Sequence, residues 1–228
     1  MFSNPPENIT SASCSSEAKK EYYDLTAPIT DKTVVFPGDP QFAIENISSL
    51  SSGASYNLCH MHLGNHTGTH IDFPAHVIKG AKTSSDFRIQ DLIGSGLIIE
   101  VPEELKSITK TFINSQTAIK KNDFVFFKTA NSRLPKQGNF NSKYVFVEPD
   151  AAAELLVKGI RIVGIDYISI DSYEAEDLPV HRMLLSNDVL IVEGLALNNV
   201  PMGRCKIYII PNNIPEMDGL PVRVLARM

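Results

Sequence analysis

Short apolar runs separated by polar and turn-forming residues recur along most of the chain. The runs are rich in Val, Ile, Phe and Tyr and are bounded by Gly, Pro, Asn or Asp, which is the pattern of β-strands. They predict strands over residues 33–36, 54–63, 96–101, 123–129, 143–147, 160–166, 188–194, 205–210 and 221–226. Strands are therefore expected to be the main secondary structure.

Two segments have the pattern of helices instead. The run "AAAELLVK" is amphipathic, begins after Pro149 and Asp150 and ends at Gly159, and these are residues that favour helix starts and stops. Because it separates two strand-like runs, we expect strands 143–147 and 160–166 to form a right-handed parallel crossover. A second helix is expected over 179–187. Many strands with few helices predict a compact mixed-sheet α/β domain.

Length and composition narrow the class of protein. A chain of 228 residues with 43% hydrophobic residues suits one globular domain. We expect residues 1–20 to be a flexible polar lead-in without the features of a signal peptide, and residues 21–228 to form a single domain. A net charge of −5 argues against a nucleic-acid partner, and no apolar run reaches the ~18 residues of a membrane span. Three cysteines without regular spacing indicate reduced thiols and a cytoplasmic location.

One short stretch, "HMHLGNHTGTHIDFPAH" (60–76), contains five of the six histidines and one aspartate. Imidazole beside carboxylate is a preferred ligand set for zinc-like ions. A straight strand would separate His66 and His70 by roughly 13 Å, too far for one ion, so we expect the chain to bend at Gly68. Glycine, β-branched residues and proline disfavour a helix here. The stretch therefore predicts a metal site on a bent loop or strand end, and the alternative is a solvated polar strand.

Two histidines of this stretch, His60 and His62, lie in an alternating strand-like run. Each of these two histidines is expected either to bind the metal ion directly or to have a structural role, such as supporting a residue that binds it. Cys59 is expected to be a packed strand residue. Structural zinc sites are typically rich in thiolate, whereas imidazole with carboxylate leaves coordination positions open to water, which favours catalysis.

The second half of the site is expected around His181 and Glu193. Glu193 ends an apolar run, and a carboxylate buried there needs a partner. That partner is either a metal ion or a salt bridge to Arg182 or Arg204, and His181 is either a ligand or a residue of the helix start.

Residues 66–76 match every fixed position of HxGTHxDxPxH, and the chain thereby resembles the metal-dependent cyclase/hydrolase family, which includes bacterial kynurenine formamidase and isatin hydrolase. The resemblance extends from about Tyr23 to the C-terminus. It also covers residues 36–40, 91–101, 164–171, 179–185, 192–195 and 219–226.

The family resemblance implies a ligand set. One ion would be held by His66, His70 and Asp72, and a second would be bridged by Asp72 and Glu193 and also bound by His181. The expected ion is Zn²⁺, with Mn²⁺ as the alternative, at one or two ions per chain.

The resemblance also implies the fold, the assembly and two further site residues. His76 would transfer protons, and Phe36, which precedes Pro-Gly-Asp where relatives commonly carry an aromatic residue, would contact the substrate. The fold would be of the swivelling β/β/α type, assembled as a homodimer or homotetramer.

The implied function is a metal-dependent hydrolase that cleaves the C–N amide bond of a small aryl formamide. Metal-bound hydroxide would attack the carbonyl, with a histidine as general acid/base. Two alternatives stay open: a ring-opening hydrolase of a cyclic amide or lactone, and a non-catalytic metal-binding protein.

Overall fold

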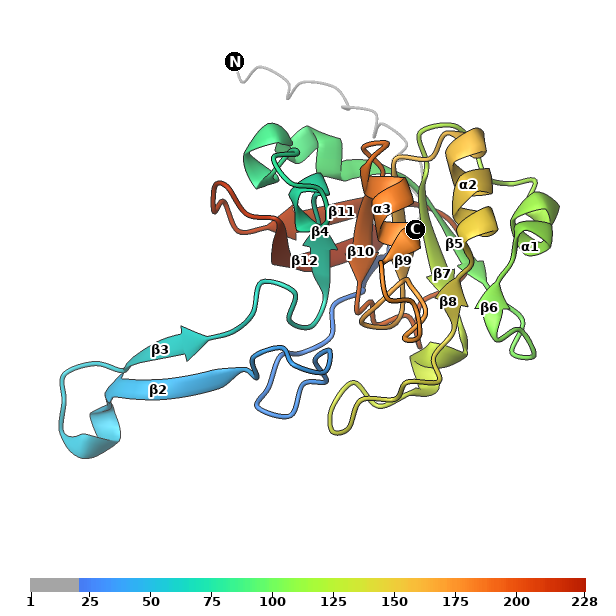
Figure 1. Cartoon of the computed structure of the whole chain (residues 1–228). Helices are drawn as coiled ribbons and strands as arrows, with labels where there is room; N and C mark the ends of the chain where they lie inside the picture. The colour runs from blue at the N-terminus through green and yellow to red at the C-terminus, as the bar shows by residue number, and fades with distance from the viewer. Residues whose placement is uncertain (1–20) are drawn as a thin grey trace, which may run out of the picture.

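The structure is a computed structural model that describes residues 21–228, and a mixed sheet closed into a barrel is its centre (Figure 1). Seven strands close the barrel because β12 pairs with both β11 and β4, and β1 adds to the outer edge of β12. In sheet order the strands are β1 (Tyr22–Asp24), β12 (Gly219–Arg227), β11 (Gly203–Pro211), β5 (Ile93–Glu100), β7 (Phe124–Lys128), β9 (Ile162–Ile165), β10 (Leu190–Glu193) and β4 (His70–Asp72).

The sheet is mixed, as expected for the α/β class. Strands β5, β7, β9 and β10 run parallel to one another, whereas β4, β11 and β12 join by antiparallel pairing. Parallel strands are buried on both faces and read as continuous apolar runs. In β7 the residues Phe124–Phe127 are all fully buried. The α/β mixed-sheet prediction is confirmed, and the swivelling β/β/α arrangement stays a prediction.

Three short helices lie side by side next to the parallel strands: α1 (Lys110–Ser115), α2 (Pro149–Lys158) and α3 (Pro179–Leu185) (Figure 1). Helix α2 begins at proline, buries one face through Ala151, Ala152 and Leu155, and ends where Gly159 adopts φ +69°. The prediction of α2 is confirmed. Helix α3 also begins at its proline but ends two residues before the expected boundary, and α1 was not expected.

Two strand predictions are wrong. Residues 33–36 form only an isolated bridge from Thr33 to Gln137, in a segment followed at once by Pro37, which has no N–H for a ladder. In the run 143–147, the Asn131 side-chain amide takes both the N–H and the C=O of Val145, at 2.7 and 2.8 Å. At Val145 a side chain therefore takes the place of a neighbouring strand.

The predicted crossover is consequently wrong in its first strand. What remains of the run, β8 (Phe146–Val147), pairs with β6 (Ser107–Ile108) in a separate two-stranded sheet. The parallel neighbour of β9 in the barrel is β7. The crossover therefore runs from β7 through β8 and α2 to β9.

A β-hairpin projects away from the barrel (Figure 1). Its strands are β2 (Ala43–Ser48), which was not expected, and β3 (Leu58–His62), which is shorter than the predicted strand 54–63. Cys59 on β3 is exposed, so the expectation that it packs in the interior is wrong.

Some of the predictions concern residues that the structure does not describe. The lead-in 1–20, with Cys14, is outside the described residues, so the division of the chain at residue 20 stays a prediction. Within 21–228, Cys59 and Cys205 are free thiols, and no helix has both the length and the apolar character needed to cross a bilayer.

Candidate metal centre

The loop before β4 makes the bend that the histidine-rich stretch requires. Gly68 has φ +71°, and a Cβ there would lie 2.9 Å from Ile29 Cγ1, so both the backbone and the neighbouring side chain favour glycine. Beyond the bend, His70 and Asp72 are two residues apart on β4 and share one face, whereas Ile71 packs into the core. The prediction of a bent strand end is confirmed.

Strand pairing brings the third member of the cluster to this face. Glu193 on β10 lies directly opposite His70 in the antiparallel register, and its Oε2 is 3.4 Å from His70 Nε2. The next residue, Gly194, has φ +67°, and a Cβ there would be 2.2 Å from the Gly68 carbonyl oxygen. The close approach of the two segments therefore requires glycine at position 194.

His181 reaches the cluster from the first turn of α3 and is held there by Asp171. The Asp171 carboxylate accepts hydrogen bonds from the Val180 N–H (2.9 Å), the His181 N–H (3.0 Å) and His181 Nδ1 (2.6 Å). With Nδ1–H donated to Asp171, Nε2 is the nitrogen that faces the cluster, and it lies 3.2 Å from Glu193 Oε1 and 3.5 Å from Asp72 Oδ2. Sequence reasoning assigned no role to Asp171, although it ends the stretch "GIDYISID".

His70 is oriented in the same way by the backbone. Its Nδ1 lies 3.1 Å from the Gly68 carbonyl oxygen and donates to it, which leaves Nε2 directed at the carboxylates. Metal-binding histidines commonly donate their second ring N–H to a carboxylate or carbonyl in this manner. Both buried imidazoles are therefore oriented as metal ligands are.

The surroundings of the Asp72 carboxylate show whether these residues fit a cation. The residue is fully buried, and its Oδ1 lies 2.8 Å from His66 Nδ1 and 3.4 Å from His70 Nε2. Its Oδ2 is buried without a hydrogen-bond partner among residues 21–228. A buried carboxylate oxygen left without a partner is costly, and a cation between Asp72 and the Nε2 atoms of the imidazoles would remove that cost. The residues fit a divalent ion.

The ligand atoms of the cluster form overlapping groups that are close enough together to hold an ion. One ligand atom each from His66, His70 and Asp72 lies within 4.8 Å of the others, and the same holds for Asp72, His76 and His181. Asp72 is common to both groups, in line with the bridging role that the resemblance implies. The second group contains His76 in place of Glu193, so ligation by Glu193 stays a prediction.

The alternative partners for Glu193 do not contact it. Arg182 donates to the carbonyl oxygens of Asp177 and Val77, and Arg204 pairs with Asp123. Glu193 instead accepts from the Ile170 N–H at 2.7 Å and faces the two imidazoles. The salt-bridge reading of Glu193 is wrong.

Asp218, which sequence reasoning missed, joins two histidines at the outer side of the cluster. Its Oδ2 lies 3.2 Å from His66 Nε2 and 3.4 Å from His76 Nδ1, while Oδ1 accepts from the Asn65 side chain at 2.8 Å. The neighbouring Gly219 is needed for this packing, since a Cβ there would be 2.3 Å from the His66 ring. Asp218 lies in a loop 142 residues from His76, and no local pattern marks it.

The buried charges shift one another's pKa values. Burial lowers the pKa of His70, but the Asp72 and Glu193 carboxylates outweigh burial and raise it to about 10. The pKa of His181 is likewise raised well above its usual value, chiefly by Glu193 and Asp171 against burial. Burial raises the pKa of Asp72, yet the surrounding imidazoles hold it well below the usual range. Without an ion, protons on the histidines neutralise the two carboxylates.

Binding of a divalent ion is therefore expected to release protons. Ligation requires neutral imidazole, and the metal-free chain keeps a proton on His70 between its ordinary pKa of 6.5 and the shifted value of about 10. At pH 8 we expect about one to two protons released per chain on Zn²⁺ binding. Calorimetric titration in two buffers of different ionisation enthalpy measures this number, and a value near zero at pH 8 would refute the ligand assignment of the buried imidazoles.

The cluster forms one side of a small pocket. The pocket has a volume of about 190 Å³ and is lined by His66, His70, His76, His181 and Glu193 together with Phe36, Asp39, Ile168, Ser169 and Leu178. This volume is below the ~300–1,000 Å³ typical of drug-sized ligands and suits a small molecule. Phe36, one of these lining residues, packs against Phe140 and Tyr173, with ring centroids 5.5 and 5.9 Å away. Phe36 thus lies where the resemblance implies, and substrate contact stays a prediction.

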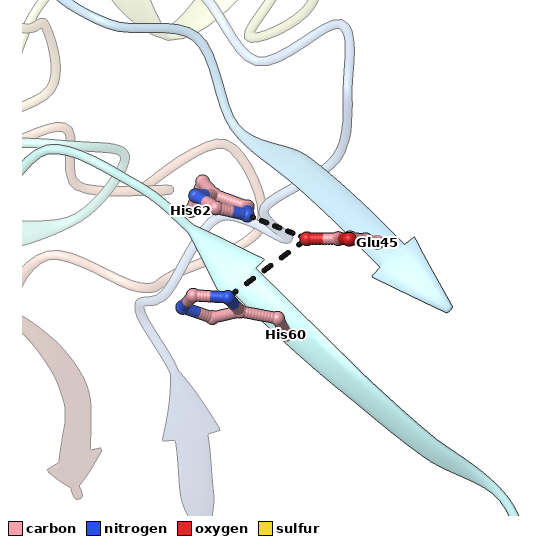
Figure 2. Close-up of side chains that lie close together, drawn as sticks. All are labelled: Glu45, His60 and His62. Atoms are coloured by element: carbon pink, nitrogen blue, oxygen red, sulfur yellow. Dashed lines mark ion pairs between the residues drawn. The ribbon is translucent and has the colours of Figure 1, made fainter. Parts of the chain in front are cut away.

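His60 and His62 do not join the central cluster. They lie on β3 of the projecting hairpin, where both are exposed and face Glu45 (Figure 2). His60 and His62 therefore neither bind an ion at the central cluster nor support the residues that do.

Comparison with known proteins agrees with the fold. The family model described as putative cyclase matches residues 23–172. A protein named kynurenine formamidase, from Salinibacter ruber, is 30% identical over 205 residues, which cover 90% of this chain and 96% of the relative. A solved structure described as a predicted metal-dependent hydrolase from Bacillus stearothermophilus is 34% identical, with a TM-score of 0.79, and the match covers 92% of this chain and 99% of that one.

An isatin hydrolase bound to the product analogue thioisatinate shares the fold at 24% identity, with a TM-score of 0.80 over 92% of each chain. The family model spans well over half of the sequence, and the relatives match along nearly their whole length. The chain belongs to the putative cyclase family.

Proposed function

We propose that this chain is a metal-dependent hydrolase that cleaves the C–N amide bond of a small aryl formamide. The observation that carries the proposal is the buried Oδ2 of Asp72, which has no hydrogen-bond partner among residues 21–228 and lies beside imidazoles that line a small pocket. The kynurenine formamidase relatives, at 30% identity over most of both chains, support the bond and substrate class.

The proposed ligands are the residues that the resemblance assigns. His66, His70 and Asp72 would hold one ion, and Asp72, Glu193 and His181 would hold a second. An ion bound there, Zn²⁺ or alternatively Mn²⁺, would supply Lewis-acid chemistry: a polarised substrate carbonyl and a lowered pKa for water.

His76 is the proposed proton-transfer residue. It lines the pocket, and its Nδ1 lies 3.4 Å from Asp218 Oδ2, so that with Nδ1–H directed to Asp218 the free Nε2 can exchange a proton. Nε2 of neutral His76 would first accept a proton from the attacking water and then deliver it to the leaving nitrogen as the C–N bond breaks, giving formate, a released proton and the free aryl amine. Phe36 and its aromatic neighbours supply a surface on which an aryl ring can pack.

A pH titration tests the protonation state of His76. Burial lowers the pKa of His76 below its usual 6.5, and positive charge on His66 and His181 adds to this against the opposing Asp72 carboxylate. A lowered pKa keeps the imidazole neutral as pH falls, so the titration midpoint of His76 in the metal-free chain should lie below pH 6.5. Proton NMR of the metal-free chain from pH 4.5 to 9 measures this midpoint, and a midpoint above 6.5 would contradict a neutral His76.

A substrate panel separates the proposed reaction from its alternatives. N-formylkynurenine and isatin, followed by ultraviolet absorbance on metal-stripped and reconstituted samples, should show metal-dependent turnover of the formamide. Faster turnover of isatin would favour the ring-opening alternative. No metal-dependent hydrolysis of any amide or ester would favour the non-catalytic metal-binding alternative.

We further propose that the chain assembles as a homodimer or homotetramer and that its binding partner is a small-molecule substrate. We also propose a cytoplasmic location and a single domain over residues 21–228.

A further inference from the structure

The β2–β3 hairpin carries a second group of metal-ligating side chains, Glu45, His60 and His62 (Figure 2). Glu45 Oε2 lies 4.0 Å from His60 Nδ1 and 3.6 Å from His62 Nε2. The two imidazole rings are 4.1 Å apart between centroids. One carboxylate oxygen is thus shared by two histidines at the outer part of the molecule, on an element that projects from the barrel (Figure 1).

Strand geometry accounts for the grouping. His60 and His62 are two residues apart on β3 and therefore share one face, and Glu45 is the direct cross-strand partner of His60. The partner of His62 is Ala43, whose small side chain leaves space beside the ring. Figure 2 shows the three side chains converging from the two strands.

Fold stability gives little reason for this arrangement. The three side chains are each 51–63% exposed, and exposed ion pairs of this kind contribute little to stability. Their ligand types, two imidazoles and one carboxylate, are those of open zinc sites that keep a position for water. The atoms are also spaced suitably: ligands bound at about 2.1 Å in a tetrahedron lie about 3.4 Å apart. Small rotations of the exposed side chains would close the observed 3.6 and 4.0 Å to that value.

We propose that Glu45, His60 and His62 bind a divalent transition-metal ion of the Zn²⁺ class, at a site separate from the central cluster. The ion would be coordinated by both histidines of β3 and the carboxylate of β2, with water completing the shell. Since its ligands come from both strands, binding would tie β2 to β3 and hold their register. The proposal stands whether or not the proposed hydrolase activity is correct.

Zn²⁺ counting on the full-length protein tests the site. Metal-stripped protein is dialysed against buffered Zn²⁺, and bound zinc per chain is measured by elemental analysis for the wild type and for the double variant His60→Ala/His62→Ala. We expect the double variant to bind one ion fewer per chain than the wild type. Asn46→Ala, on the other face of β2, is the matched control and should retain the wild-type number.

A conservative variant separates ligation from general charge. Glu45→Gln keeps the shape of the side chain but removes its charge. We expect this substitution to raise the Kd for Zn²⁺ at the hairpin site, which is the weaker of the sites because its ligands are exposed, by at least tenfold. Turnover should be unchanged in all these variants, because none of the altered residues lines the central pocket. Equal zinc counts and equal Kd values in wild type and variants would overturn the proposal.

A measurement on the unaltered chain keeps the test independent of variant folding. Diethylpyrocarbonate modifies accessible imidazoles, and both rings are exposed in the metal-free hairpin. Zn²⁺ at concentrations that fill the weaker site should slow modification of His60 and His62 by at least fivefold, as measured by peptide mass spectrometry. Modification at the same rate with and without Zn²⁺ would also overturn the proposal.

Discussion

Asp72→Asn should remove metal from the central cluster and lower kcat/KM by about 10³-fold or more. The Asp72 carboxylate faces three histidines from one fully buried position, and an amide would supply neither its charge nor a second anionic oxygen. An ion contributes several kcal/mol of charge stabilisation to such a reaction, and each 1.36 kcal/mol is a factor of ten in rate. Elemental analysis and steady-state kinetics measure the two effects.

The matched control for this substitution is Asp188→Asn. Asp188 is exposed, pairs with Lys82 at the surface and has φ +57°, a backbone conformation that asparagine tolerates well. We expect the control to keep metal content, turnover and melting temperature. Full metal content together with wild-type kcat/KM in Asp72→Asn would remove Asp72 from the ligand set, and with it the core of the proposed function.

His76→Ala should lower kcat by about 10²- to 10⁴-fold, the usual range for loss of a proton-transfer group, while metal content stays at the wild-type level. His76 is partly exposed in the pocket and contacts Asp218, whereas the two imidazoles buried deepest beside the carboxylates are those of His70 and His181. Removing His76 therefore leaves those ligands in place. Kinetics and elemental analysis on the same preparation separate the two quantities.

The outcomes for His76 are distinct. Loss of one ion along with activity would make His76 a ligand of the second position, which its distance from Asp72 and His181 allows. Unchanged turnover would exclude it from the reaction. His60→Ala, a histidine exposed on the hairpin, is the control for turnover and should retain wild-type kcat.

Local pattern predicted the elements that local interactions determine. Helix α2 follows from its proline start, its amphipathic face and Gly159, all within eleven residues. The apolar runs likewise predicted six of the barrel strands, from β5 to β12. The pattern failed at 143–147 because the Asn131 side chain, from another segment, takes both hydrogen-bonding groups of Val145. Such competition depends on a contact between separate segments, and apolar periodicity does not record it.

The site divides in the same way. The stretch 66–76 by itself determined that imidazole and carboxylate groups would gather and that Gly68 would bend between them, since both depend on residue spacing and on backbone freedom at one position. That His181 and Glu193 also belong followed from the family resemblance, because residues more than a hundred positions apart have no spacing to read.

Only the tertiary structure decided which groups complete the centre. Closure of the barrel sets β4 between β10 and β12, and this register puts Glu193 opposite His70 and the loop of Asp218 beside His66 and His76. The same level of structure separated His60 and His62 from their neighbours in sequence and placed them with Glu45 on the hairpin. Residue types and short spacings determine what a segment can bind, whereas strand register and chain crossing determine which segments meet.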